Sequence, residues 1–299
     1  MAKSEPNRYE KVIKQCSKLY EGFKDADKVV GVVYAAIDDY FKTYPFDPLP
    51  AIDLEKSTEQ MRSGMSMDLN PHLKSAEVVG LLKKTSEALL KGNPKLKGTV
   101  ASLHHRFDQF LADAAIETSK EDILGLRDLL IKETLLEQDL ATFLFSLVLT
   151  SFYRQHLELS SEALRTDLWE GGNCPLCGEK PHFGMLRAED GAKQMECWLC
   201  STTWVHNRVK CPYCNNEERG ELGYFTVEDN DICRVQYCKS CCQYYKVFDA
   251  RKFSADGEVF LPIHNLATLA YDLLARQEGF TPGSGLEWVN ENELPERQD

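Results

Sequence analysis

The motif CPLCG at residues 174–178 recurs as CPYCN at residues 211–215, and these two stretches decide the fold. Each is followed by a second Cys-x-x-Cys pair, CWLC at 197–200 and CKSC at 238–241. The second pairs also match, because Trp204 and Tyr245 follow them at the same distance. One such pair is weak evidence, but four pairs in two matched halves are typical of tandem metal-binding ribbons.

The paired cysteines are the candidate metal ligands, and we predict one ion for each half. One ion would be held by Cys174, Cys177, Cys197 and Cys200, and the other by Cys211, Cys214, Cys238 and Cys241. Sequence order alone leaves an interleaved pairing open. Four thiolates suit zinc or iron equally, and a closed Cys₄ shell has no position for water or substrate. The pattern therefore favours a structural or electron-carrying metal over a hydrolytic one.

The size of each half supports this interpretation. A unit of about 35–40 residues buries too little apolar surface to fold alone, and a Cys₄ metal site supplies roughly 10–16 kcal/mol. Strand-like runs at 181–186 and 221–227 lie between the pairs. The residue after the second cysteine of a knuckle often needs a positive φ, which Gly178 and Asn215 tolerate better than Ser201 and Cys242.

The other cysteines and histidines of this region are predicted to be non-ligands. Cys233 and Cys242 break the spacing of the repeat, and replacement of a ligand or a role as a free thiol is the alternative for either. His182 and His206 would be needed only if a cysteine were missing from a set. Thioredoxin-like redox chemistry is a minor alternative, since it requires Cys-x-x-Cys at a helix start in a βαβ setting.

The chain before residue 170 is predicted to be helical. Apolar residues at helical spacing indicate helices near 9–20, 26–41, 75–92, 103–111 and 123–164, with Cys16 as a buried thiol and a long loop over 43–74. Ser119 and Asp122 resemble a capping box. Gly171 and Gly172 are expected to form a flexible joint. A last helix is expected from Leu266 to about residue 277, with its leucines on one side.

The predicted fold class is therefore α plus small β. It has an all-α domain (1–168), two tandem rubredoxin-like or zinc-ribbon modules (169–206 and 207–255), and a C-terminal helix with an acidic tail (256–299).

Composition excludes several classes of function. The 299 residues carry a formal charge of −12, and residues 174–242 hold 8 basic against 10 acidic side chains, which disfavours nucleic acid as a partner. No secretory signal is visible and the longest uncharged stretch, residues 140–153, is too short to span a membrane, so we expect a cytoplasmic protein without membrane insertion. The sequence contains no GxGxxG, P-loop or HExxH motif. We predict no catalytic residue, and no enzyme.

Several segments resemble one family: CPLCG, CWLCSTTW, RVKCPYC, YCKSCCQYYKVFD and, near the C-terminus, LATLAYDLLARQEGF. They are similar to those of the formate dehydrogenase accessory proteins, the FdhE family. The resemblance implies two rubredoxin-like metal modules in which the eight paired cysteines bind metal. It also implies a cytoplasmic maturation factor that contacts the catalytic subunit of formate dehydrogenase before export. One departure is Cys242, where similar proteins typically carry glycine.

Two other functions stay open at this stage. A nucleic-acid-binding zinc ribbon is opposed by the net charge of the cysteine-rich region. A rubredoxin-type electron carrier suits the Cys₄ chemistry, but its loops would be shorter and a large helical domain would be unnecessary.

Overall fold

The computed structural model describes residues 9–43, 54–69, 71, 73–113, 117–134, 138–161, 166–227, 230–253 and 258–284. The chain divides into two compact units. The first comprises Met1–Asp47 and His72–Phe152, and the second comprises Pro48–Pro71 and Tyr153–Asp299. Residues 48–71 therefore belong with the cysteine-rich region, although they precede most of the helical unit in the sequence.

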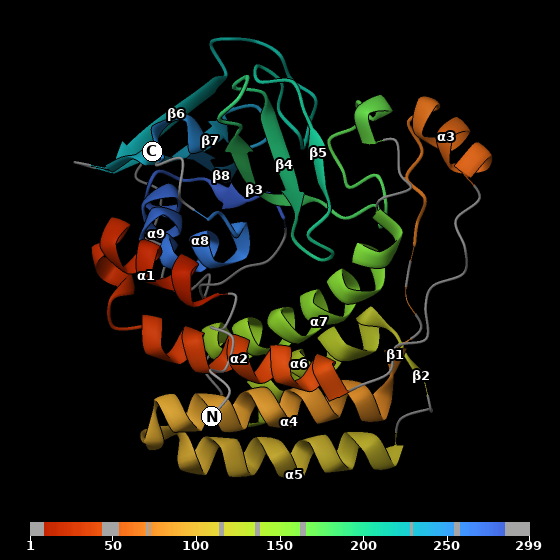
Figure 1. Ribbon diagram of the computed structural model, residues 1–299, viewed down its shortest axis with the longest axis vertical. Helices are drawn as coiled ribbons and strands as arrows, with labels where there is room; N and C mark the ends of the chain where they lie inside the picture. The colour runs from red at the N-terminus through yellow and green to blue at the C-terminus, as the bar shows by residue number, and fades with distance from the viewer. Residues whose placement is uncertain are drawn as a thin grey trace, which may run out of the picture. The chain divides into compact units, whose positions relative to one another are not determined.

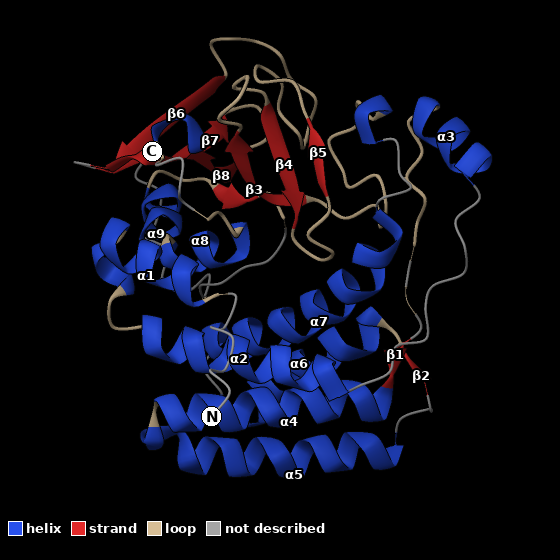
Figure 2. Cartoon of the chain, viewed as in Figure 1, coloured by secondary structure: helices blue, strands red, loops and turns tan. Residues whose placement is uncertain are grey.

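The first unit is built from helices (Figures 1 and 2). They are α1 (Glu10–Leu19), α2 (Asp27–Thr43), α4 (Ser75–Gly92), α5 (Lys97–Asp113), α6 (Lys120–Thr134) and the first part of α7 (Gln138–Ser161), with a short β1–β2 pair at Leu73–Lys74 and Glu117–Thr118. Helix α4 packs between α2 and α5. Fully buried side chains form its core: Val33, Leu81, Leu82, Phe107, Leu144 and Phe145.

Local signals in the sequence set the ends of these helices. The Ser119 backbone N–H donates to Asp122 Oδ2 at 2.9 Å, and the Asp122 N–H donates to Ser119 Oγ at 3.1 Å, which is the reciprocal pattern of a capping box. Helix α4 ends at Gly92 before the short 3₁₀ turn Pro94–Leu96. Cys16 is fully buried on α1, as its place on the apolar face predicts.

The second unit is organised around a seven-stranded sheet (Figure 2). Its strands are β3 (Pro181–Leu186), β4 (Lys193–Cys197), β5 (Thr203–Val205), β6 (Leu222–Val227), β7 (Asn230–Cys238), β8 (Gln243–Asp249) and β9 (Thr281–Pro282). The order is β5-β4-β3-β8-β7-β6, and β9 pairs with β8. Strands β3–β5 belong to the first cysteine repeat and β6–β8 to the second. The two repeats are therefore joined edge to edge by the parallel β3–β8 pair.

Residues 54–69 support the first cysteine repeat. Helix α3 (Leu54–Arg62) precedes an extended segment that pairs with the first knuckle. The N–H groups of Met67 and Leu69 donate to the carbonyls of Pro175 and Leu176 at 2.8 and 2.9 Å. Met61 is buried, whereas Met65 is 56% exposed. The segment expected to be a long loop thus contains helix α3 and partly covers the first knuckle.

The C-terminal helix differs from the expectation. It is split at Thr268 into α8 (Leu261–Ala267) and α9 (Leu269–Gln277). The leucines of α9 that share one side, Leu269, Leu273 and Leu274, are exposed, while its opposite side, with Asp272 and Arg276, is buried.

A buried ion pair lies on the side of α9 that faces the sheet. Lys246 on β8 is 1% exposed, and its Nζ donates to Asp272 Oδ2 at 2.6 Å and to the carbonyls of Asn265 and Thr268 at 2.9 and 3.3 Å. The Tyr244 hydroxyl donates to Asp272 Oδ1 at 2.9 Å. A buried carboxylate without partners is costly, so these contacts are what allow Asp272 to be buried on this side of α9.

The expected flexible joint at Gly171 and Gly172 is packed instead. A Cβ on Gly172 would overlap the carbonyl oxygen of Pro212, and one on Gly171 would overlap the Trp169 ring. The Trp204 indole also donates to the Gly171 carbonyl at 3.2 Å. The two glycines allow close approach of backbone to neighbours, which is a packing role.

None of the helices formed by the described residues combines the length and the apolar character that a membrane crossing requires.

Candidate metal centres

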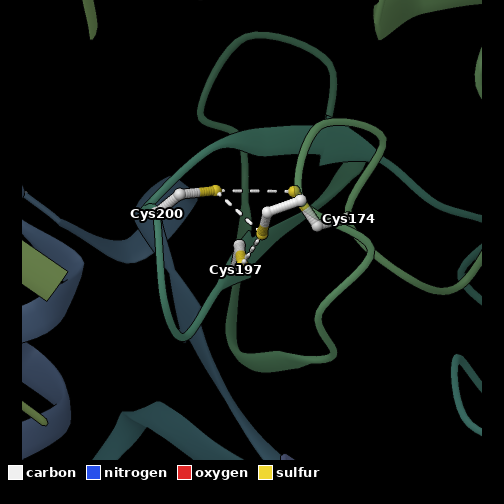
Figure 3. Close-up of side chains that lie close together, drawn as sticks. Cys174, Cys197 and Cys200 are labelled. Carbon is white, nitrogen blue, oxygen red and sulfur yellow. Dashed lines mark hydrogen bonds between the residues drawn. The ribbon is translucent and has the colours of Figure 1, made fainter. Parts of the chain in front are cut away.

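The first group of thiols comes from two turns, one before β3 and one after β4. The Sγ atoms of Cys174, Cys177, Cys197 and Cys200 all lie within 4.8 Å of one another. Cys174 and Cys200 point toward each other, with their sulfurs 3.5 Å apart (Figure 3). Cys177 Sγ lies 3.5 Å from Cys197 Sγ and 3.4 Å from Cys200 Sγ. All four side chains are buried.

The second group is formed in the same way but is more open. Cys211, Cys214, Cys238 and Cys241 also lie within 4.8 Å of one another, with sulfur–sulfur distances of 3.8 Å for Cys211–Cys241 and 3.7 Å for Cys214–Cys238. Cys211 and Cys238 are buried, Cys241 is half-buried and Cys214 is exposed. The sulfurs of each half gather with one another, so the interleaved arrangement is not the one observed.

These distances fit a tetrahedral metal. A Zn–S bond of about 2.3 Å places the four sulfurs of a tetrahedron about 3.8 Å apart, whereas a disulfide requires about 2.05 Å. The observed distances of 3.4–3.8 Å are close to the first value and far from the second. Each group could therefore hold one metal ion, and the geometry does not choose between iron and zinc.

The backbone of all four knuckles follows one design. The residue after the second cysteine has a positive φ in each: Gly178 at 74°, Ser201 at 56°, Asn215 at 61° and Cys242 at 55°. The sequence-based prediction of this conformation is confirmed, including at Ser201 and Cys242, where it is strained. The positive φ closes the turn, and the closed turn places the two cysteine sulfurs of the knuckle close together.

Backbone N–H groups also point at the sulfurs. The Leu176 N–H donates to Cys174 Sγ and the Leu199 N–H donates to Cys197 Sγ, both at 3.4 Å. The turns close through N–H groups of Gly178 and Ser201, which donate to the carbonyls of Cys174 and Cys197 at 3.1 and 3.2 Å. Such donors stabilise negative charge on sulfur, so the knuckles are prepared for thiolates.

Without a cation the first group cannot ionise completely, because its thiolates would repel one another. Burial raises the pKa of Cys197 and Cys200 well above the usual value. Burial opposes ionisation of Cys174 as well, yet hydrogen bonds from the other three thiols bring its pKa well below that value. Binding of a metal ion would therefore release protons.

The other cysteines and histidines of the described cysteine-rich region lie outside both groups. Cys233 is fully buried, and burial raises its pKa to about 12, while Cys242 is exposed and donates to the Lys239 carbonyl. His182 lies 3.4 Å from Glu196. His206 is buried, and burial lowers its pKa to about 4.

Two buried lysines were missed by the sequence reasoning. Lys193 and Lys246 are each 1% exposed, on β4 and β8 of the shared sheet. Lys246 pairs with Asp272, and Lys193 Nζ donates to the Tyr245 hydroxyl at 2.9 Å. The available signal was a lysine inside a strand flanked by aromatic or apolar residues, as in QYYKVFD.

Comparisons with known proteins all find similarity to FdhE proteins. Residues 173–208 match the family model described as FdhE, central domain. The chain is 32% identical over 164 residues to a protein FdhE homolog of Aquifex aeolicus, covering 54% of this chain and 56% of the relative. It is 29% identical over 150 residues to protein FdhE of Escherichia coli, covering 49% and 47%. The chain thus spans about half the length of the curated relatives it matches.

The fold is shared over a greater length. The crystal structure of the FdhE protein from Pseudomonas aeruginosa superimposes with a TM-score of 0.61 at 20% identity, covering 97% of this chain and 98% of the other. At this identity the similarity concerns the fold. The matched central domain, the curated relatives and the common fold together show that the chain resembles the FdhE proteins.

Proposed function

We propose that this protein is a cytoplasmic accessory factor that binds the catalytic subunit of a formate dehydrogenase before export and is needed for its activity. The observation that carries the proposal is the pair of Cys₄ groups in a chain that resembles the FdhE proteins. The first group is completely buried, with four sulfurs at the spacing of a closed tetrahedral shell. A closed shell holds a fold together and offers no position for a substrate, so binding of a protein client is favoured over hydrolysis.

Each Cys₄ group, in this proposal, binds one iron or zinc ion with all four of its cysteines as ligands. The ion would stabilise the knuckles, since neither repeat has a large core of its own. Elemental analysis of freshly purified protein should give two ions per chain. One ion or fewer in protein never exposed to chelator would contradict the assignment.

The test of function begins with deletion of the gene, which should abolish or strongly reduce formate oxidation. Complementation with the Cys211→Ser/Cys214→Ser variant should fail, because the second group loses half of its sulfurs. Cys242→Ser is the matched control: it alters an exposed cysteine of the same knuckle region that lies outside the group, and it should restore activity. Full formate dehydrogenase activity in the deletion strain, with no homologue to compensate, would refute the proposal.

Binding of the catalytic subunit by this protein requires a separate experiment. Tagged protein recovered from cytoplasm under anaerobic conditions should retain the catalytic subunit, identified by mass spectrometry. Retention should be weaker for Cys211→Ser/Cys214→Ser than for Cys242→Ser if the second ribbon contributes to the contact. Equal recovery in both variants would place the contact elsewhere.

The exposure of Cys214 favours one alternative, a rubredoxin-type electron carrier. A metal with a ligand at the surface can exchange electrons with a partner more readily than a buried one. A red, iron-loaded protein with a reversible couple would support this alternative, and a colourless zinc protein would exclude it.

A further inference from the structure

A cavity of about 170 Å³ opens beside the second Cys₄ group, and Cys211 and Cys238 form part of its wall. Three basic residues line it: Arg208, Lys210 and Arg219. No carboxylate is found among the described residues that line it. The concentration of positive charge is unusual in a chain with a formal charge of −12.

The sheet supplies the polar and aromatic part of the wall. Tyr224, Gln236 and Tyr245 are directly opposite one another on β6, β7 and β8, so their side chains share one face of the sheet. All three line the cavity. Tyr224 is 61% exposed, whereas Tyr245 is buried at the inner end.

Two further basic residues, Lys193 and Arg234, contact residues of this wall. Lys193 Nζ donates to the Tyr245 hydroxyl at 2.9 Å and to the Lys210 carbonyl at 3.3 Å, so the buried ammonium adjoins two lining residues. The Arg234 guanidinium lies 4.9 Å from the centre of the Tyr224 ring. Five of the eight basic residues between positions 174 and 242 therefore gather here.

The positive charges of these residues repel one another, and the pKa values of Lys193 and Arg234 are lowered. Burial, with smaller contributions from the nearby charges of Arg234 and Arg208, lowers the pKa of Lys193 to about 7. Burial also lowers the pKa of Arg234, and Arg208 contributes to that shift. Asp249 partly compensates Arg234 but is itself paired with Arg251 at 2.7 Å, and Glu217 lies 3.6 Å from Lys210. An anion in the cavity would relieve this repulsion.

The hydrogen bonds at the inner end of the cavity also leave a donor for a ligand. With its amide oriented to satisfy both ends, Gln236 donates to the Tyr245 hydroxyl at 2.5 Å and accepts from Arg234 Nη2 at 3.0 Å. The Tyr245 oxygen then accepts from both Gln236 and Lys193, which leaves its own proton to be donated. The cavity thus offers a hydroxyl, two guanidinium groups and an ammonium, all of them donors.

We propose that this cavity is a binding site for a phosphate group, either free or carried by a small molecule whose ring lies against Tyr224. Guanidinium groups match the geometry of phosphate oxygens in pairs, and the volume is several times the roughly 30 Å³ that one water occupies. The site is independent of the proposed role in formate dehydrogenase maturation, and either can fail without the other.

Calorimetric titration of metal-loaded, full-length protein with inorganic phosphate, with AMP and with adenosine tests the site. We expect saturable binding of phosphate and AMP, and none of adenosine. AMP binding more tightly than phosphate would show that the ring contributes, and equal affinities would show that the phosphate group alone is bound. No saturable binding of either anion at low ionic strength would refute the proposal.

Two variants locate the binding. Arg208→Gln and Arg219→Gln change exposed side chains that line the cavity, and each should weaken binding at least about tenfold, the size of one charge-assisted hydrogen bond. Lys239→Gln is the control, because it removes the same charge from an exposed position between Cys238 and Cys241 that does not line the cavity. It should change affinity less than about twofold, a difference well below one charge-assisted hydrogen bond.

A competing explanation is that these cations only balance the negative metal–thiolate group, which carries a net charge of about −2 with a divalent ion. In that case Arg208→Gln and Arg219→Gln would lower the metal content and leave phosphate affinity unchanged, and the proposal would be wrong. A single-stranded oligonucleotide that binds much more tightly than AMP, with steep salt dependence, would also overturn it in favour of a nucleic-acid surface.

Discussion

Removal of the Lys246 ammonium is the most informative perturbation of the fold. Lys246→Met keeps most of the side-chain volume but leaves Asp272 buried at 6% exposure without its cation. It also removes one of the donors to the carbonyls of Asn265 and Thr268. The Tyr244 hydroxyl would still donate to that carboxylate at 2.9 Å.

The magnitude follows from the burial of both partners. Breaking a buried ion pair by removing one partner costs about 3–5 kcal/mol, because the other charge is left uncompensated. We expect Lys246→Met to lose about 4 kcal/mol of unfolding free energy, a large part of the 5–15 kcal/mol typical of a domain. Adding Asp272→Asn, which removes the charge but can keep the contact with Tyr244, should recover about 2 kcal/mol.

Urea unfolding followed by tryptophan fluorescence measures this effect in the appropriate unit, since Trp169, Trp198 and Trp204 all lie in it and are buried. Lys252→Met is the control, because Lys252 forms an exposed ion pair with Asp231 and should lose less than about 1 kcal/mol. Equal losses for Lys246→Met and Lys252→Met, or no recovery in the double variant, would show that the buried pair does not hold α8 and α9 to the sheet.

Three further results are expected. Cys174→Ser should lose one metal ion by elemental analysis while Cys16→Ser, buried on α1, loses none; equal losses would contradict the ligand assignment. Cys242→Gly should retain both ions and raise the melting temperature slightly. The reason is that glycine adopts φ 55° without the strain of roughly 1 kcal/mol that a side chain causes. Loss of an ion from this variant would show that Cys242 is a ligand. Burial lowers the pKa of His264 to about 4, so the stability that depends on its neutral form is lost as pH falls from about 6.5 toward 4, by up to about 3 kcal/mol. Denaturation curves of His264→Leu should therefore show a weaker pH dependence of stability over that range. An unchanged pH dependence would exclude this histidine as its source.

The features that the sequence could predict are those determined by neighbouring residues. The knuckle turns follow from Cys-x-x-Cys and the residue after it, and the positive φ at Ser201 and Cys242 was inferred even though neither residue favours it. The capping box at Ser119 and Asp122 is equally local. The FdhE resemblance is confirmed, whereas the domain ranges and the roles of the eight cysteines as ligands stay predictions.

The features that escaped prediction depend on residues far apart in the chain. The orientation of α9 could not be read from its leucines, because the ion pair of Asp272 with Lys246 lies across 26 positions of sequence. The contact of Met67 and Leu69 with the first knuckle joins segments more than a hundred residues apart. The same is true of the parallel β3–β8 pair, since local patterning carries no information on which strands become neighbours.

That parallel pair has a consequence for synthesis on the ribosome. Strand β3 is complete at Leu186, but its partner β8 begins only at Gln243. At 5–20 residues per second, roughly 60 residues take about 3–12 s to translate. During this interval one edge of β3 has no strand to pair with and can associate with other nascent chains. Early capture of metal by the first four cysteines would keep the unfinished sheet in its native form until the second repeat emerges.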